Sequence, residues 1–315
     1  MKIVALSFAG IIILLVMSLA AFIAATWAPE RTVDELKARW APPPSKFLDV
    51  AGMSVHVRDE GPVEDKSPIV LLHGAGSSLH AWEGWAEALR GERRVIRLDL
   101  PGFGLTGPTP NGVYTICNDM SVVIAILDRL GIERCLLGGN SLGGEIAWQT
   151  ALAHASRVEM LILVDAAGYP FASLAQPLGI RLAKMPGASW LLQNTLPRFL
   201  VEEGLRNVFG DPSKVSPEMV ERSVELTQRA GNRRAFLERF HQVRSNLEQR
   251  IPELKLPTLI IWGAKDRLIE PSNAERFHQD IAGSKLVIFD DLGHAPEEED
   301  PAKTVAAVKQ FLSPE

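Results

Sequence analysis

Short apolar runs alternate with stretches of helical periodicity along most of this chain. An apolar run bounded by Gly, Pro or Asp is typical of a buried strand, and a helical pattern follows most of these runs. The predicted strands cover residues 69–72, 94–98, 135–137, 160–164, 258–262 and 285–289, after a hairpin pattern at 47–50 and 53–58. Strands that alternate with helices form a parallel sheet covered on both faces. We therefore predict an α/β fold with a mostly parallel, doubly wound sheet.

The alternation is interrupted once, from about residue 169 to residue 249. This segment has no strand-like run, and its helical pieces cover 178–184, 190–209, 217–229 and 233–246. An insertion between two strands of such a sheet lies over the carboxyl ends of the strands, where ligands bind. We therefore predict a helical lid over residues 169–252 and a core made of residues 47–168 and 253–315.

The N-terminal stretch has a different character, because residues 3–27 carry no charge. As a helix, such a stretch is roughly 37 Å long, enough to cross a hydrocarbon layer of about 30 Å. We predict a transmembrane anchor over residues 1–28 and a stiff, proline-containing linker over residues 29–46. A cleaved signal peptide is the alternative, although its apolar part is usually shorter. Lys2 on one side and Arg31 on the other leave the membrane orientation open.

Composition and charge narrow the classes of function. The chain of 315 residues has a net charge of −5 at neutral pH, without the basic surface typical of nucleic-acid binding. Its two cysteines, Cys117 and Cys135, predict neither a disulfide framework nor a cysteine metal site. No metal or organic cofactor is implied, and the oligomeric state is left open.

A serine stands at the turn between one predicted strand and the helix that follows it. The segment Gly139-Asn140-Ser141-Leu142-Gly143 has the spacing G-x-S-x-G. Small residues are needed on both sides because the backbone at such a turn is strained and packs closely against its neighbours. The turn holds the hydroxyl at the edge of the sheet, beside the N-terminus of a helix. Ser141 is therefore a candidate nucleophile.

A serine hydroxyl is a weak nucleophile at neutral pH, so it needs a base and an acid that orients the base. His294 follows Gly293 in the loop after the last predicted strand, and Asp266 follows the strand at 258–262. The order Ser, Asp, His is that of one known arrangement of these three residues. Asp165, at the end of another predicted strand, is the alternative acid.

Five motifs in this order resemble the α/β-hydrolase superfamily from about residue 47 to the C-terminus. They are HGAG at 73–76, DLPGFG at 99–104, GNSLGG at 139–144, WGAKD at 262–266 and GH at 293–294. The resemblance implies that Ser141 is the nucleophile, His294 the base and Asp266 the orienting acid. It also implies an oxyanion hole formed by the backbone N–H groups of Ala75 and Leu142.

Within this superfamily, the chain is similar to small bacterial lipases and esterases with an N-terminal membrane segment. It is also similar to hydrolases that cleave C–C bonds in aromatic ring-fission products. The serine at the turn argues against dehalogenases and epoxide hydrolases, which place a carboxylate there. We expect a carboxylic ester hydrolase of small apolar esters, attached to a bacterial inner membrane.

Two alternatives remain. The first is C–C bond hydrolysis by the same three residues. There an aromatic residue often follows the histidine, where this chain has Ala295-Pro296, and a lid arginine binds the substrate carboxylate, for which Arg222 is a candidate. The second is a membrane-tethered binding module without enzymatic activity, since a fold alone does not imply function.

Overall fold

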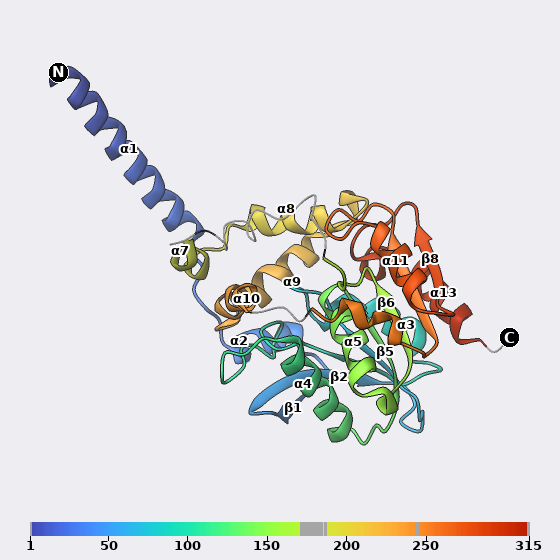
Figure 1. The fold of residues 1–315 in the computed structure, drawn as a ribbon. Helices are drawn as coiled ribbons and strands as arrows, with labels where there is room; N and C mark the ends of the chain where they lie inside the picture. Colours follow the sequence, from blue (N-terminus) through green and yellow to red (C-terminus); the bar gives the residue numbers. More distant parts are fainter. Residues whose placement is uncertain (1, 171–184, 186–187, 243–245, 314–315) are drawn as a thin grey trace.

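A mixed, mostly parallel sheet of eight strands forms the centre of the molecule (Figure 1). The computed structural model describes residues 2–170, 185, 188–242 and 246–313. The strands are β1 (Lys46–Val50), β2 (Met53–Glu60), β3 (Ile69–Leu72), β4 (Val95–Leu98), β5 (Cys135–Asn140), β6 (Val158–Val164), β7 (Thr258–Gly263) and β8 (Lys285–Phe289). Their spatial order is β1-β2-β4-β3-β5-β6-β7-β8, and β2 runs antiparallel to both of its neighbours. The predicted α/β class is confirmed.

The order of the strands reverses direction at β3, which pairs in parallel with β4 on one side and with β5 on the other. In open α/β sheets, ligands bind at the carboxyl ends of the strands beside such a reversal. Leu72, the last residue of β3, pairs with Gly139, and Asn140 at the end of β5 pairs with Val164 of β6. Three strand ends therefore meet at the edge from which Ser141 emerges.

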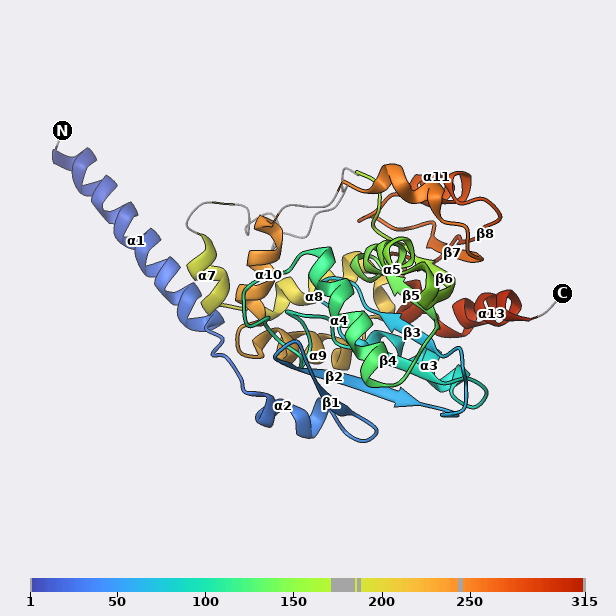
Figure 2. The ribbon, with the colours of Figure 1, turned by 60° about the horizontal axis from the view of Figure 1, so that its bottom comes forward.

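Helices cover both faces of the sheet (Figure 2). They are α3 (Glu83–Leu89), α4 (Ile116–Arg129), α5 (Leu142–Ala153), α11 (Ser272–Asp280) and α13 (Pro301–Leu312). Because side chains of a strand alternate between its faces, Ile69 and Leu71 of β3 join one apolar cluster, with α3 and α13. Val70 and Leu72 join the other, with α4, α5 and α11.

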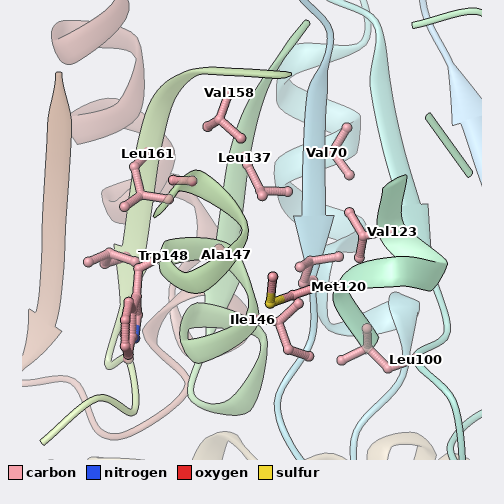
Figure 3. Packing of buried hydrophobic residues seen from close by; sticks show 14 of the residues in the cluster. Val70, Leu100, Met120, Val123, Leu137, Ile146, Ala147, Trp148, Val158 and Leu161 are labelled. Carbon is pink, nitrogen blue, oxygen red and sulfur yellow. The ribbon is translucent and has the colours of Figure 1, made fainter. Parts of the chain in front are cut away.

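The helix that follows Ser141 is buried over almost its whole length. Ile146, Ala147 and Trp148 of α5 belong to the same buried apolar cluster as Leu137 of β5 and Leu161 of β6, and Figure 3 shows Ile146 on the side of Met120. Burial of each large apolar side chain contributes about 1.5–3 kcal/mol. The indole N–H of Trp148 donates to the carbonyl of Ala167 (2.9 Å), so this buried polar group keeps a hydrogen-bond partner. This packing fixes the position of the turn at the start of α5.

Between β6 and β7 the described residues form helices and contribute no strand to the sheet. These helices are α7 (Ala188–Asn194), α8 (Arg198–Val208), α9 (Pro217–Gln228) and α10 (Asn232–His241). The helix predicted over 190–209 is divided in two, because Pro197, at the N-cap of α8, has no backbone N–H to continue a helix. The helix predicted over 178–184 lies outside the described residues.

The N-terminal part consists of α1 (Lys2–Thr26), which projects away from the body of the molecule in Figure 1, and α2 (Val33–Trp40). Thr32 caps α2 through a reciprocal pair of hydrogen bonds with Glu35. In the described part of the chain, no helix has both the length and the apolar character needed to span a bilayer. The transmembrane helix predicted over residues 1–28 is therefore not supported.

Candidate active site

The turn after β5 has the strained backbone that its sequence predicts. Ser141 has φ 53° and ψ −114°, which is an unfavourable conformation for a residue with a side chain. A Cβ atom at Gly139 would lie 2.2 Å from the carbonyl carbon of Gly143, and one at Gly143 would lie 2.1 Å from the carbonyl oxygen of Leu72. Only glycine fits at either position, so the turn brings β3, β5 and α5 into direct backbone contact.

The backbone of Ser141 is held on both sides. Its N–H donates to the carbonyl of Val164 (3.0 Å), and its carbonyl accepts from Glu145 (3.1 Å) and Ala167 (3.0 Å). These bonds stabilise the strained turn against relaxation. Leu142 is the first residue of α5, so its N–H belongs to the N-terminus of that helix.

His294 and Asp266 form a buried hydrogen-bonded pair. His294 Nδ1 lies 2.7 Å from Asp266 Oδ2, and both residues are buried. Because an ionised carboxylate only accepts, the ring proton belongs on Nδ1, which leaves the Nε2 lone pair available. The other oxygen of Asp266 accepts the N–H groups of Leu268 (2.7 Å) and Ile269 (3.0 Å). The carboxylate is thus fixed, and it fixes the orientation of the ring.

A side chain next to the serine ties the histidine to the same edge of the sheet. Asn140 Nδ2 donates to the carbonyl of His294 at 2.8 Å, across 154 positions of sequence. The N–H of His294 donates to the carbonyl of Val208 (2.7 Å), the last residue of α8. Within the described part of the chain, no hydrogen bond joins the Ser141 hydroxyl to the His294 ring. Such bonds are often long before a substrate binds.

Glu299 holds the loop that carries the histidine, a role not predicted from the sequence. Its carboxylate accepts three backbone N–H groups at 2.8 Å each, from Gly210, Asp211 and Gly293. Asp300, at the end of the acidic run at 297–300, caps α13 by accepting from Lys303. No local pattern reveals the role of Glu299, because two of its partners lie about ninety positions away.

Asp165, the alternative acid, lies close to the pair, but among the described residues no hydrogen bond joins it to the His294 ring. It is fully buried at the end of β6, and its Oδ1 accepts the N–H of Gly263 (3.1 Å). Burial, together with the nearby charge of Asp266, raises the pKa of Asp165 well above its usual range. In the described structure the ring of His294 bonds to Asp266.

The loop after β3 lies next to the serine. A Cβ atom at Gly74 would lie 2.6 Å from Asn140 Oδ1 and 3.2 Å from Ser141 Cβ. His73 braces this loop: its Nδ1 lies 2.7 Å from the carbonyl of Gly74, and its Nε2 accepts the N–H of Leu100 (3.0 Å). Burial lowers the pKa of His73, so the ring is neutral. Ala75, a predicted oxyanion-hole donor, is the next residue of this loop.

Aromatic side chains from the lid and the core meet above this loop. Phe236 of α10 would lie 3.9 Å from a Cβ atom at Gly76, and its ring packs edge-on against Phe103. Arg239 fastens the helix by pairing with the buried Asp119 (2.6 Å) and donating to the carbonyl of Pro101. Helix α10 therefore places an aromatic side chain next to the loop after β3.

Arg222 has a different environment from the one that C–C hydrolysis predicts for it. Its guanidinium pairs with Glu298 and lines a cavity of about 390 Å³ between α2 and α9. None of Ser141, Asp266 and His294 lines that cavity.

Asp165, Asp266 and His294 are also the types of residue that bind metals, and they offer ligand atoms within 4.8 Å of one another. However, both oxygens of Asp266 already accept N–H groups, and one of these groups belongs to the histidine ring. This bonding is typical of a carboxylate that orients a base.

Comparison with known proteins places this geometry among hydrolases. The family model of the alpha/beta hydrolase fold matches residues 67–301. The chain is 30% identical over 282 residues to a 2-hydroxy-6-oxo-2,4-heptadienoate hydrolase of Pseudomonas putida, and the match covers 86% of this chain and 96% of that protein. A membrane phospholipase A of known structure has a TM-score of 0.73 at 25% identity, with 97% of each chain covered. A thermophilic esterase from Thermogutta terrifontis has a TM-score of 0.70 at 26% identity, with 85% of this chain and 96% of that chain covered.

Proposed function

Because this chain belongs to the α/β-hydrolase family, we propose that it is a serine hydrolase that cleaves carboxylic esters through an acyl-enzyme. The observation that carries the proposal is the buried Asp266–His294 pair, which Asn140 ties to the strained turn at Ser141. A strained serine beside an oriented imidazole is the arrangement that activates a hydroxyl for attack on a carbonyl.

In the proposed reaction, Ser141 Oγ attacks the ester carbonyl while its proton moves to His294 Nε2. Asp266 keeps the ring in place and stabilises the imidazolium that forms. The N–H groups of Ala75 and Leu142 bind the oxyanion, and loss of one such donor typically costs about 2.7–4 kcal/mol of transition-state stabilisation. The imidazolium then protonates the departing alcohol, and water attacks the acyl-enzyme in a second round with the same proton transfers.

The surroundings of the serine favour an apolar ester. Phe103 and Phe236 lie near the loop that carries Ala75, where an acyl group would lie. The residue after the histidine, Ala295, packs among apolar side chains of the lid and offers no aromatic ring. Arg222 is paired with Glu298. These features support an ester over a ring-fission substrate with a free carboxylate.

C–C bond hydrolysis is the second candidate, and the 30% identity to the Pseudomonas putida hydrolase favours it. It would use the same three residues, so the distinction depends on the substrate that the pocket accepts.

The test compares p-nitrophenyl esters of increasing acyl length with a ring-fission dienoate, with Ser141→Ala as the control. We expect hydrolysis of the esters, abolished by Ser141→Ala. Activity on the dienoate alone would replace the ester proposal with C–C hydrolysis. Absence of both activities, with no reaction of Ser141 with an organophosphonate, would favour the binding module.

We also propose that the protein is associated with a bacterial inner membrane. The support is the exposure of apolar side chains along α1, where Leu14 and Leu15 are 66% and 63% exposed, because such a surface requires an apolar partner. Fractionation of cells that produce the full chain tests this proposal. We expect the protein in the membrane fraction, released by detergent but not by salt, whereas recovery in the supernatant would refute it.

A further inference from the structure

A second carboxyl group lies behind the proposed catalytic pair, and the proposed reaction does not use it. Polar atoms of Asp165, Asp266 and His294 all lie within 4.8 Å of one another, so the carboxyl groups of Asp165 and Asp266 are close neighbours. Asp165 is fully buried and has φ 43°, so its backbone is strained. A strained, buried acid at this place invites a functional explanation.

Two buried carboxyl groups this close together cannot both be ionised, because like charges repel strongly away from water. The hydrogen bonds identify the ionised partner. Asp266 accepts three N–H groups, one of them from the His294 ring, and each bond stabilises its negative charge. From the residues that the structure describes, Asp165 accepts only the N–H of Gly263. The shared proton therefore belongs on Asp165.

The remaining oxygen of Asp165 supports the same assignment. Among the described residues no N–H or O–H group donates to its buried Oδ2. An ionised oxygen in that position would be left unsatisfied, at a large free-energy cost. A protonated Oδ2 would be a donor instead, and the neighbouring carboxylate of Asp266 would be its acceptor.

We propose that Asp165 is a neutral carboxylic acid that donates a hydrogen bond to Asp266 and so holds this carboxylate in line with the His294 ring. The inference rests on the proposed function of that pair and assigns Asp165 as a positioning residue. The other buried acid near Asp165 is Glu297 of α12 (Pro296–Glu299). Burial raises the pKa of Glu297 well above its usual range, which favours its neutral form, so the proton on Asp165 is assigned from hydrogen bonding and not from a charge on Glu297.

Two substitutions in the full chain test this role. Asp165→Asn keeps the shape and a donor N–H, and asparagine tolerates a positive φ. Asp165→Ala removes the donor. We expect Asp165→Asn to keep kcat/KM for the p-nitrophenyl ester within about threefold, and Asp165→Ala to lose about 10–100-fold in kcat with KM little changed, as for a lost hydrogen bond to a charged group.

The pH profile of kcat/KM separates positioning from simple stability. We expect Asp165→Asn to leave the acid limb in place, because no charge changes. In Asp165→Ala the limb should move to higher pH, because the carboxylate of Asp266 loses a donor and stabilises the imidazolium more strongly. If Asp165→Asn moves the limb to lower pH and slows turnover as much as Asp165→Ala, Asp165 is ionised and the inference is wrong. An Asp165→Ala enzyme with wild-type kcat and pH profile would also overturn it.

Infrared spectroscopy tests the proton directly and needs neither a substrate nor the alanine variant to fold. At neutral pH we expect a C=O stretching band of a protonated carboxyl that disappears in Asp165→Asn. Glu297→Gln is the matched control, because it removes the other buried acid and should leave the Asp165 band. Absence of a band that Asp165→Asn removes would refute the neutral acid. A protein that hydrolyses no ester but shows the band would refute the proposed function and keep this assignment.

Discussion

At the scale of single residues, three acidic residues near His294 have different roles because they accept different numbers of N–H groups. Asp266 is surrounded by N–H groups and can remain charged. Asp165 and Glu297 each have a buried carboxyl oxygen that receives no hydrogen bond from the described residues. Burial raises the pKa of both. The negative charge that a base such as His294 needs is thus concentrated on one carboxylate.

Asp266→Asn should reduce kcat on the preferred p-nitrophenyl ester by about 10⁴-fold, because the amide favours the wrong tautomer of the ring and carries no charge. Steady-state kinetics measure the loss, with the exposed Asp49→Asn as the control that should keep wild-type activity. A loss below about tenfold would mean that another group orients His294.

Glu297→Gln should stabilise the protein at neutral pH. Burial raises the pKa of Glu297 in the folded state, whereas in the unfolded chain a glutamate has a pKa of about 4.3. The neutral carboxyl group contributes fully to the free energy of unfolding at pH values below its pKa in the unfolded chain. This contribution is lost as the pH rises towards its pKa in the folded protein. Each pH unit in this window costs about 1.4 kcal/mol, which the glutamine avoids.

Thermal unfolding as a function of pH measures this effect. The Tm of Glu297→Gln should exceed that of the wild type by an amount that grows from about pH 4 upwards. The exposed Glu64→Gln serves as the control and should give no such trend. A Tm difference that does not change with pH would show that Glu297 is ionised in the folded protein.

At the scale of elements, the lid and the histidine loop form one hydrogen-bonded unit. The end of α8 accepts the N–H of His294 through Val208, and Glu299 joins Gly210 of the lid to Gly293 of the loop. A Cβ atom at Gly293 would lie 2.3 Å from the carbonyl oxygen of Val208, so the two segments are in backbone contact. The insertion therefore supports the position of the base.

Glu299→Gln should lower both stability and turnover. An amide nitrogen would face backbone N–H groups that need an acceptor, and each lost charged hydrogen bond costs about 1.5–3 kcal/mol. We expect a lower Tm and a kcat reduced by at least about tenfold, because the histidine loop loses its anchor. Glu298→Gln is the matched control: it removes the ion pair with Arg222 and should keep kcat. Equal kcat values for the two variants would contradict the role of Glu299.

At the scale of the whole molecule, the sequence was most informative where structure depends on near neighbours. The short apolar runs predicted the strands, since a strand buried on both faces needs apolar residues at every position. The turn at Ser141 was predicted because its glycines are adjacent in sequence. The helix expected over 190–209 is interrupted between Asn194 and Arg198, directly before which Pro197 stands.

The long-range contacts could not be predicted in the same way. Asn140 meets His294 across 154 positions, and Asp165 receives the N–H of Gly263 across 98. These pairs exist because parallel strands bring distant strand ends to one edge of the sheet, and no local pattern specifies which side chains bond there. A long-range contact also changes the interpretation of Arg222. Its guanidinium could bind a substrate carboxylate, but in the structure it is paired with Glu298.

The central claim is that the His294 ring activates the Ser141 hydroxyl, and the rate at which an organophosphonate labels the protein tests it most directly. Mass spectrometry should locate a single adduct on Ser141 in the wild type, and His294→Gln should slow its formation by about 10²–10⁴-fold, because the hydroxyl loses its base. Labelling of Ser141 at an equal rate in His294→Gln, or an adduct on a different residue, would contradict the account.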